Sequence, residues 1–464
     1  RLREAQKRVA GRDPARREWR AHARLQTAGL PVPRPLAWGE GRRGEAFVVT
    51  ERLRGRPLAD ELAEANQAPL LRRRLVALCD TLKALHDAGL AHGDLHLGNR
   101  WWGPDGVWLL DVGHIRPIHH PKDHDRDRAQ LELSLARSLP HARAVEMLRS
   151  LWGASSDLDA ARIDFLRDYQ RGRARRRVRV GCDWERVQVG RARGLRDHRF
   201  PQARLEDALE SCSRTRRESR RDGRVVIHRL PARNGAPALV VKRVEAGRAG
   251  RALADRLRGS AAARAFRAGQ RRRLVDEGCA PPLAYLDETR MGIPIRSWLV
   301  LESVGREDLD RHRPASAEHA AETGRALGHW LAGQHAAGLG HRDLKGSNLR
   351  ITPEPDGTEA TRLGEARPRF FLLDLEDLTG PAPIPIEARL TALSQLNASL
   401  PDEAFDDRAR LAALEAYAAR LPFDEPLERV ARRIIEKSRA RAHRWTGGTA
   451  DSATGEARKR TSEP

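Results

Sequence analysis

Two short stretches of this sequence share one arrangement of polar residues. "AHGDLHLGN" (91–99) and "GHRDLKGSN" (340–348) both contain the pattern His-x-Asp-x-x-x-x-Asn. Each is followed by an apolar run that ends in aspartate, "VWLLD" at Asp111 and "FFLLD" at Asp374. One such pattern arises easily by chance, but two copies with the same sequel indicate shared chemistry.

Phosphoryl transfer is a reaction that requires these residue types. It needs a carboxylate to orient the acceptor hydroxyl, an amide and a second carboxylate to hold Mg²⁺, and a cation on the nucleotide phosphates. The predicted acceptor-orienting residues are Asp343 and Asp94. The predicted metal ligands are Asn348 and Asp374 in one copy, and Asn99 and Asp111 in the other. We therefore expect ATP and Mg²⁺ as cofactors.

Lysine is rare in this chain, which carries most of its positive charge as arginine. A retained lysine indicates a place where a planar guanidinium cannot replace a compact ammonium. Lys242 ends the apolar run "PALVVK" and is predicted to contact the nucleotide phosphates. The stretches "RVVIHRL" and "ALVVKRV" are predicted to form a hairpin around "NGAP". Lys345 lies two residues after Asp343, inside one of the polar loops.

The likeness between the two copies extends on both sides of the polar loops. "AGLPVPRPLAWGE" (28–40) aligns with "EGCAPPLAYLDET" (277–289), and both follow a stretch of helical pattern. Further on, the strands "AFVVTERLRG" and "SWLVLESVGR" have polar edges, where Glu51 and Glu302 are predicted to help bind the cofactor. The chain is therefore predicted to contain two homologous units.

Length and composition agree with two globular domains. The 464 residues exceed one ordinary core, and 40% hydrophobic residues suffice for packing. The sequence shows neither a long apolar stretch nor a signal-peptide pattern at its start, so we expect a cytoplasmic protein. The cysteines lack the paired spacing of a zinc ribbon or a disulfide framework. They are Cys79, Cys182, Cys212 and Cys279.

The formal net charge of +22 bears on possible partners. Basic clusters occur at 171–180 and 213–221, and such runs are most often solvated surface or linker. They also suit an anionic lipid surface or a phosphorylated substrate. No aromatic-rich strand of the RNA-recognition type accompanies them, which argues against nucleic acid.

Together, these motifs resemble the protein-kinase-like fold, and within it the lipopolysaccharide core kinases that phosphorylate Kdo or heptose. "HGDLHLGN" with "LLDVGHIRP", and "ARREWRAHARLQTAGLPVPRPLAWGE" (15–40), carry this resemblance. The helices expected in "DRDRAQLELSLARSL" and "EARLTALSQLNASLP" also resemble that group. The resemblance covers roughly residues 10–170 and 220–440.

The resemblance implies an α+β protein of two tandem bilobal units, each with a β-rich N-lobe and a helical C-lobe. We expect the first unit at 1–180, a basic connector with the start of the second N-lobe at 181–222, the second unit at 223–446 and a disordered tail at 447–464. The implied partners are ATP and an anionic glycolipid or sugar acceptor, with peripheral contact at the cytosolic membrane face.

In this fold the phosphate-binding lysine of a strand pairs with a helix glutamate. In the first unit Glu18 is the candidate for this glutamate, and we predict that it helps to bind the cofactor. The position matching Lys242 falls just before Arg1, so the first unit's lysine either precedes the given sequence or is missing. Lys7 is a local alternative.

The second unit shows the converse pattern. Lys242 is present, but the position matching Glu18 falls at about Ala265. Glu245 or Glu277 would need a rearranged helix to pair with this lysine.

Lys345 resembles the lysine that touches the transferring phosphate in Ser/Thr protein kinases and is predicted to be catalytic. "HRDLKGSN" thus favours a protein kinase as one alternative. A second alternative is a tandem pseudokinase that acts as a nucleotide-binding scaffold. It is suggested by the missing lysine of the first unit and the missing helix glutamate of the second. The absence of an APE-like motif and of a long activation segment after Asp111 or Asp374 favours a sugar kinase.

Overall fold

The computed structural model describes residues 14–441 apart from several internal gaps. The gaps are 42–44, 66, 121, 140–141, 153–155, 182, 215–218, 221–224, 234, 246–248 and 353–367. Lys7, Cys182 and the tail predicted at 447–464 lie outside the described residues. The described chain forms two compact units, whose boundary falls after Phe165.

The first unit begins with a helix and a hairpin. Helix α2 (Pro14–Thr27) packs on strands β1 (Pro35–Glu40) and β2 (Ala46–Thr50), which pair antiparallel. The helical part follows, with α3 (Leu58–Ala63), α4 (Ala68–Asp87), α5 (Lys122–Ser138) and α6 (Ala142–Trp152). The leucines Leu71, Leu75, Leu78, Leu82 and Leu85 recur at helical spacing along α4 and are buried in the core. This periodicity explains why α4 lies against the rest of the unit.

Short strands join the helices of the first unit. Strands β3 (Arg56–Pro57), β5 (Arg100–Gly103) and β6 (Gly106–Leu109) form a three-stranded sheet. Strand β4 (Leu90–Ala91) pairs with β7 (Arg116–Pro117). The predicted polar loop 91–99 starts at β4 and ends in the 3₁₀ helix η1 (Leu97–Asn99), and Asp111 precedes η2 (Val112–His114).

The second unit contains a seven-stranded antiparallel sheet, with order β10-β11-β12-β14-β13-β9-β8. Its strands are β8 (Trp184–Val189), β9 (Ala192–Asp197), β10 (Ser219–Arg220), β11 (Val225–Leu230), β12 (Leu239–Glu245), β13 (Pro282–Arg290) and β14 (Ile293–Glu302). Strands β11 and β12 pair in the hairpin that the sequence predicts, with Lys242 opposite Ile227. That prediction is confirmed. Strands β8 and β9 come from the stretch 181–222, so this stretch completes the sheet at the edge beside β13.

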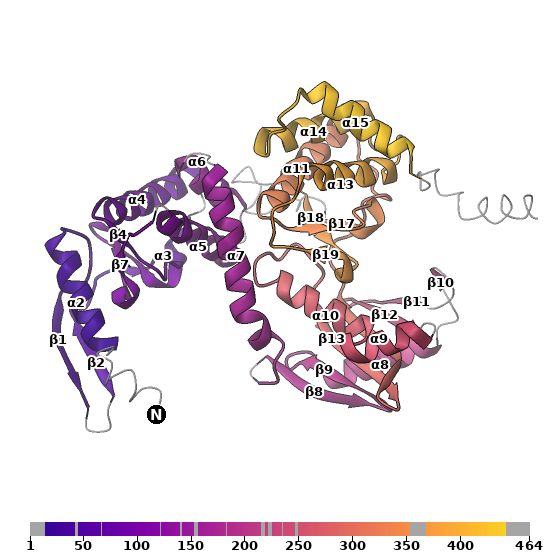
Figure 1. Cartoon of the computed structure of the whole chain (residues 1–464), viewed down its shortest axis with the longest axis horizontal. Helices are drawn as coiled ribbons and strands as arrows, with labels where there is room; N and C mark the ends of the chain where they lie inside the picture. Colours follow the sequence, from indigo (N-terminus) through magenta and orange to yellow (C-terminus); the bar gives the residue numbers. More distant parts are fainter. Residues whose placement is uncertain are drawn as a thin grey trace, which may run out of the picture. The chain divides into compact units, whose positions relative to one another are not determined.

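Helices border the sheet, and others form a lobe of their own. Helices α8 (Gln202–Arg214), α9 (Ala249–Arg258) and α10 (Ala261–Arg272) contact the strands. The helical lobe contains α11 (Ala317–Ala336), α13 (Ile386–Ser399), α14 (Asp407–Arg420) and α15 (Leu427–Arg439). Figure 1 shows these four helices gathered together, with the short strands near β17 and β18 between them and the sheet. The predicted α+β class is confirmed.

The connections between the two lobes repeat the local structure of the first unit. Strands β15 (Glu307–Asp308), β17 (Leu349–Thr352) and β18 (Arg369–Leu372) form a three-stranded sheet, and β16 (Gly340–His341) pairs with β19 (Leu378–Thr379). The 3₁₀ helices η3 (Gly346–Asn348) and η4 (Leu375–Asp377) match η1 and η2 in position. The polar loop and its following aspartate therefore occupy the same supersecondary frame twice.

Helix α7 (Ser156–Arg177) runs from the first unit into the second. Arg162, in the first half of this helix, is buried and forms an ion pair with the buried Glu132 of α5. Arg149 forms a second ion pair with the same carboxylate. No helix among the described residues is long and apolar enough to cross a membrane.

Candidate functional site

The loop of the second unit brings three predicted site residues together. Lys345 Nζ donates to Asp343 Oδ2 at 2.7 Å, and Asn348 Nδ2 donates to the Asp343 carbonyl oxygen at 2.8 Å and to Oδ2 at 3.3 Å. Asp343 and Lys345 are partly exposed, whereas Asn348 is buried. An acceptor hydroxyl can therefore reach the Asp343 carboxylate beside a fixed ammonium.

Side chains of α13 hold the backbone of this loop. Gln395 Oε1 accepts from the Leu344 amide at 3.0 Å, and Ser399 Oγ accepts from the Gly346 amide at 2.8 Å. Each of these backbone donors would otherwise lack a partner inside the unit, which is costly. The sequence indicates a helix here, but it does not indicate which of its polar residues face the loop.

The ring of His341 bonds to the backbone at Asp343 and at Leu373. Its Nδ1 accepts from the Asp343 amide at 3.3 Å, so its Nε2 carries the proton and donates to the Leu373 carbonyl at 3.0 Å. Burial lowers the pKa of this histidine, which agrees with a neutral ring. His341 therefore fixes the position of Asp343 relative to the strand that ends at Asp374.

The predicted metal ligands of the second unit lie on adjoining backbone segments. The Leu373 amide donates to the Asn348 carbonyl at 2.8 Å, and Asp374 follows directly. Asp374 has φ 51°, in the left-handed region that non-glycine residues rarely adopt. This turn ends the strand and presents the carboxylate at its edge.

The donor set formed by Asn348 and Asp374 fits Mg²⁺. Among the described residues, no group of three or more His, Cys, Asp or Glu side chains forms a ready-made metal site. Mg²⁺ in phosphoryl-transfer sites commonly takes one or two protein oxygens and completes its shell with phosphates and water. An amide oxygen and a carboxylate at this turn meet that requirement.

Lys242, on β12, reaches the same turn. Its Nζ donates to Asp374 Oδ1 at 2.5 Å and to Glu376 Oε1 at 3.0 Å. Burial alone lowers the pKa of Lys242, but the Glu376 and Asp374 carboxylates outweigh it and raise that pKa above its ordinary value. The lysine is therefore a fixed cation at neutral pH. Sequence reasoning found Lys242 and Asp374 but missed Glu376.

The two strand-end glutamates lie apart from these contacts. Glu302 is the last residue of β14, and it lines a surface hollow of about 540 Å³ together with the turn between β11 and β12. Glu51 follows β2 of the first unit, and its Oε1 accepts from the Arg34 amide at 2.9 Å. Their cofactor-binding role stays a prediction.

The loop of the first unit has a similar internal geometry. Asn99 Nδ2 donates to the Asp94 carbonyl at 3.3 Å, and the Leu110 amide donates to the Asn99 carbonyl at 3.0 Å. Asp94 Oδ1 accepts from Gln130 Nε2 at 2.8 Å, and His96 takes the sequence place of Lys345, with its Nε2 at 3.8 Å from Asp94 Oδ2. Asp111 has φ 49°. Asp94, Asn99 and Asp111 thus stand in the same frame as their counterparts.

Asp127 of α5 binds the backbone of this first loop. The sequence patterns did not predict this role. Its carboxylate is buried and accepts from the His92 amide at 2.6 Å and from the Gly93 amide at 3.0 Å. It also contacts His86 Nε2 at 3.2 Å. Asp127 ends the histidine- and aspartate-rich stretch 114–127, and no spacing in that stretch distinguishes it from the other acids.

Glu18 of α2 faces the Asp111 turn. A Cβ built on Gly113 would lie 3.5 Å from the Glu18 Cβ, so the two residues are in contact range. Partial burial and the nearby Asp111 raise the pKa of Glu18 above its usual value. Its Oε1 lies 4.0 Å from His22 Nε2. Such a carboxylate is placed to receive a cation at the turn.

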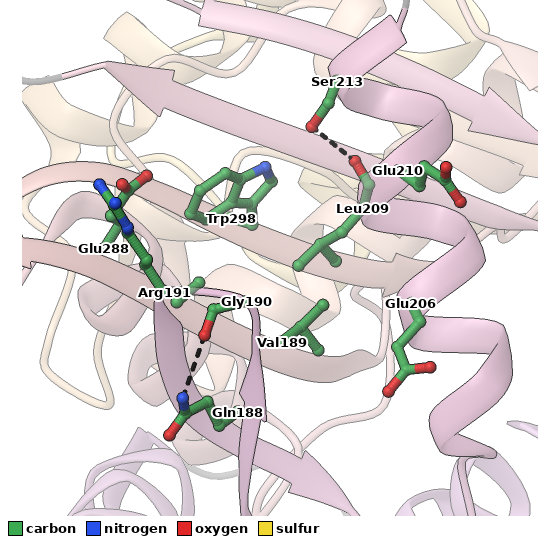
Figure 2. Close-up of a pocket in the computed structure, with 11 residues that line it drawn as sticks. Gln188, Val189, Gly190, Arg191, Glu206, Leu209, Glu210, Ser213, Glu288 and Trp298 are labelled. Carbon is green, nitrogen blue, oxygen red and sulfur yellow. Dashed lines mark hydrogen bonds between the residues drawn. The ribbon is translucent and has the colours of Figure 1, made fainter.

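A second surface hollow lies away from all the predicted residues. It measures about 560 Å³ and is bordered by the β8–β9 turn, α8 and strand β14, with Trp298 in its wall (Figure 2). Figure 2 shows Glu206 and Glu210 on α8 and Glu288 beside Arg191 around it. It takes no part in the contacts of Lys242, Asp343 or Asp374.

Comparison with known families relates the first unit to one of them. Residues 2–150 match the family model described as the lipopolysaccharide kinase (Kdo/WaaP) family. The first unit is therefore similar to that kinase family over most of its length. The match covers Glu18, Asp94, Asn99 and Asp111, and it ends before the second unit begins. The sequence-based recognition of this family is confirmed.

Solved structures with similarity to the chain include two kinases. One is WaaP in complex with acyl carrier protein, with 19% identity, a TM-score of 0.33, and coverage of 52% of this chain and 95% of that one. Another is a divergent kinase lacking the glycine-rich loop, which regulates membrane ultrastructure of the Toxoplasma parasitophorous vacuole; it has 14% identity, a TM-score of 0.26, and coverage of 53% and 91%. No curated protein matches the chain.

Proposed function

We propose that this chain transfers the γ-phosphate of ATP to a sugar hydroxyl of the lipopolysaccharide core, at the cytosolic face of the membrane. The observation that carries the proposal is the constellation in the second unit, where Lys242 is bonded to Asp374 and Asp343 is bonded to Lys345 and Asn348. The family of the first unit supports the sugar acceptor.

Each residue of the second unit then has a role in phosphoryl transfer. Asp343 accepts a hydrogen bond from the acceptor hydroxyl and orients it, and Lys345 places a positive charge beside it, where negative charge gathers on the transferring phosphoryl group. Lys242 binds the nucleotide phosphates as a point charge. Asn348 and Asp374 would hold Mg²⁺, which neutralises charge on the β- and γ-phosphates when bound.

The first unit carries the same frame with a different charge pattern. Asp94, Asn99 and Asp111 repeat the acceptor-orienting and metal-binding positions, and Glu18 lies at the turn. We assign the transfer step to the second unit because Lys242 bonds there to Asp374, beside the loop of Asp343.

The experiment is an assay of Mg²⁺-dependent phosphate transfer from [γ-³²P]ATP to purified lipopolysaccharide core, with the parent and Asp343→Asn. We expect labelled core with the parent and a loss of about 10²–10⁴-fold in kcat with the variant. A parent that binds ATP but labels neither the core nor a protein substrate would support the pseudokinase alternative. Labelling of a protein substrate in preference to the core would support the protein kinase.

A further inference from the structure

The backbone establishes which residues of the two units correspond. In the first unit the Leu109 amide donates to the Pro31 carbonyl at 2.9 Å, and in the second the Leu372 amide donates to the Gly278 carbonyl at 2.9 Å. Each leucine lies two residues before the left-handed aspartate, and each carbonyl lies just after the preceding helix. Pro31 therefore matches Gly278.

This correspondence places Glu18 opposite Ala265. Both residues precede their matched carbonyl by the same number of positions. Ala265 is 3% exposed on α10, and the sequence of α10, "AAARAFRAGQRR", contains no acidic residue. The helix of the second unit therefore has no carboxylate to offer a lysine.

The turns after the two aspartates also differ, but here the acidic residue belongs to the second unit. The second residue after Asp111 is Gly113, whereas the second residue after Asp374 is Glu376. One unit thus has an acid on the helix and glycine at the turn, and the other has alanine on the helix and an acid at the turn. The two exchanges place one carboxylate beside each turn.

Packing agrees with this exchange. In the first unit, the Glu18 side chain is in contact range of Gly113, and it lies over the turn. In the second unit α10 approaches the turn through a glycine, because a Cβ built on Gly269 would lie 2.6 Å from Leu375 Cδ1. Glu376, the residue after Leu375, accepts from Lys242 Nζ at 3.0 Å.

We infer that Glu376 replaces the helix glutamate in the second unit as the residue that positions Lys242 for the phosphates of a nucleoside triphosphate. The inference rests on the proposed function. Lys242 bonds to both Asp374 and Glu376, and Asp374 is also a proposed metal ligand. Glu376 would hold the ammonium in place while the Asp374 carboxylate held Mg²⁺.

The affinity for ATP offers a readout that needs no acceptor and no transfer. Lys242 Nζ donates to Asp374 at 2.5 Å and to Glu376 at 3.0 Å. Removing the Glu376 carboxylate takes away one of these two contacts, so the affinity for the nucleotide phosphates is expected to fall.

The test compares the full chain with Glu376→Gln and Glu376→Asp, and with Glu288→Gln as a matched control. Glu288 forms a similar ion pair, with Arg296 at 3.2 Å, on the other side of the sheet. The Kd for MgATP is measured by isothermal titration calorimetry, and the KM for MgATP and kcat are measured in parallel.

We expect Glu376→Gln to raise the Kd for MgATP about tenfold, because the ammonium that contacts the phosphates is held less firmly. The KM for MgATP is expected to rise about tenfold or more. Glu376→Asp should retain most of the parent affinity, and Glu288→Gln all of it.

The two failures are distinguishable. An unchanged Kd and an unchanged KM for MgATP in folded Glu376→Gln would overturn the inference while the parent remains an active kinase. A raised Kd in Glu376→Gln with no phosphate transfer by the parent would support the pairing of Glu376 with Lys242 and reject the proposed function.

Discussion

Individual buried side chains determine much of the stability of the helical lobe. Tyr417 is fully buried, and its hydroxyl accepts from Arg389 Nε at 2.9 Å and contacts His335 Nδ1 at 2.7 Å. Burial, together with Arg389 and Arg272, lowers the pKa of His335 to about 3, so the ring is neutral and Nδ1 accepts the hydroxyl proton. One hydroxyl therefore bonds to a buried histidine on α11 and to a partly buried arginine on α13.

Tyr417→Phe removes this hydroxyl. We expect a loss of about 1–3 kcal/mol in the free energy of unfolding, because Arg389 and His335 each lose a buried partner. Urea unfolding followed by tryptophan fluorescence measures it. Tyr285→Phe is the control, since Tyr285 is half-buried and packs through its ring on Phe266. Equal stability of the two variants would contradict the prediction.

The lowered pKa of His335 also predicts that the free energy of unfolding depends on pH. Its folded pKa of about 3 lies below the ordinary value of 6.5, so between these values the unfolded chain binds a proton that the folded chain does not. Its contribution to stability is complete above pH 6.5 and is lost as the pH falls.

Between pH 7 and pH 5 the parent should therefore lose about 2 kcal/mol more unfolding free energy than His335→Gln. Urea titrations at the two pH values measure the difference. Parallel losses in the two proteins would show that His335 is not the linked group.

At the scale of elements, the contact of α11 with α14 depends on glycine. A Cβ built on Gly324 would lie 2.3 Å from the Ala409 carbonyl oxygen, and one on Gly328 would lie 1.9 Å from that of Ala413. The backbones approach so closely that no side chain fits between them. The spacing of these two glycines on one helix face permits this crossing.

Gly328→Ala is expected to destabilise the second unit by about 1–3 kcal/mol, because the helices must separate to admit the methyl group. The control is Gly172→Ala in α7, where nothing lies within 4 Å of the added Cβ. There we expect a gain of about 0.5–1 kcal/mol from helix propensity alone. Thermal unfolding compares the two. A stabilised Gly328→Ala would reject the close crossing.

At the scale of the whole molecule, the chain uses one supersecondary frame twice with different charges. Both units contain the polar loop, the short hairpin and a left-handed aspartate. The described second unit adds the seven-stranded sheet that carries Lys242. We therefore expect the two loops to differ in their effect on transfer.

Asp94→Asn should leave kcat within about threefold of the parent, whereas Asp343→Asn should lower it by about 10²–10⁴-fold. The same acceptor assay measures both variants, with circular dichroism as the check on folding. A larger loss in Asp94→Asn would assign the transfer step to the first unit.

The net charge of +22 predicts salt-sensitive binding to an anionic membrane. Co-sedimentation with vesicles that contain anionic lipid should fall strongly between 50 and 500 mM NaCl, because screening shortens the reach of surface charge from about 10 Å near 0.1 M salt toward 3 Å at 1 M. Vesicles of zwitterionic lipid are the control. Binding that is independent of salt would exclude this attraction.

Local patterns in the sequence predicted the motifs, the resemblance of the first unit to a kinase family and the hairpin that carries Lys242. These are local features, because a polar loop after a short strand, or two apolar runs around a turn, bring their residues together within a few positions. The αL geometry of Asp111 and Asp374 was not predicted. Both residues lie just after the strands formed by the apolar runs, and their metal-binding role stays a prediction.

The choice of the carboxylate that meets Lys242 depends on tertiary packing. Glu376 is more than a hundred residues away along the chain, and the sequence pattern predicts an acid on the helix, where Ala265 stands. The same holds for Gln395 and Ser399 on α13, which bind the loop backbone. Such partners depend on how a strand, a turn and a helix pack, and a side-chain contact of this kind leaves no periodic signal in the sequence.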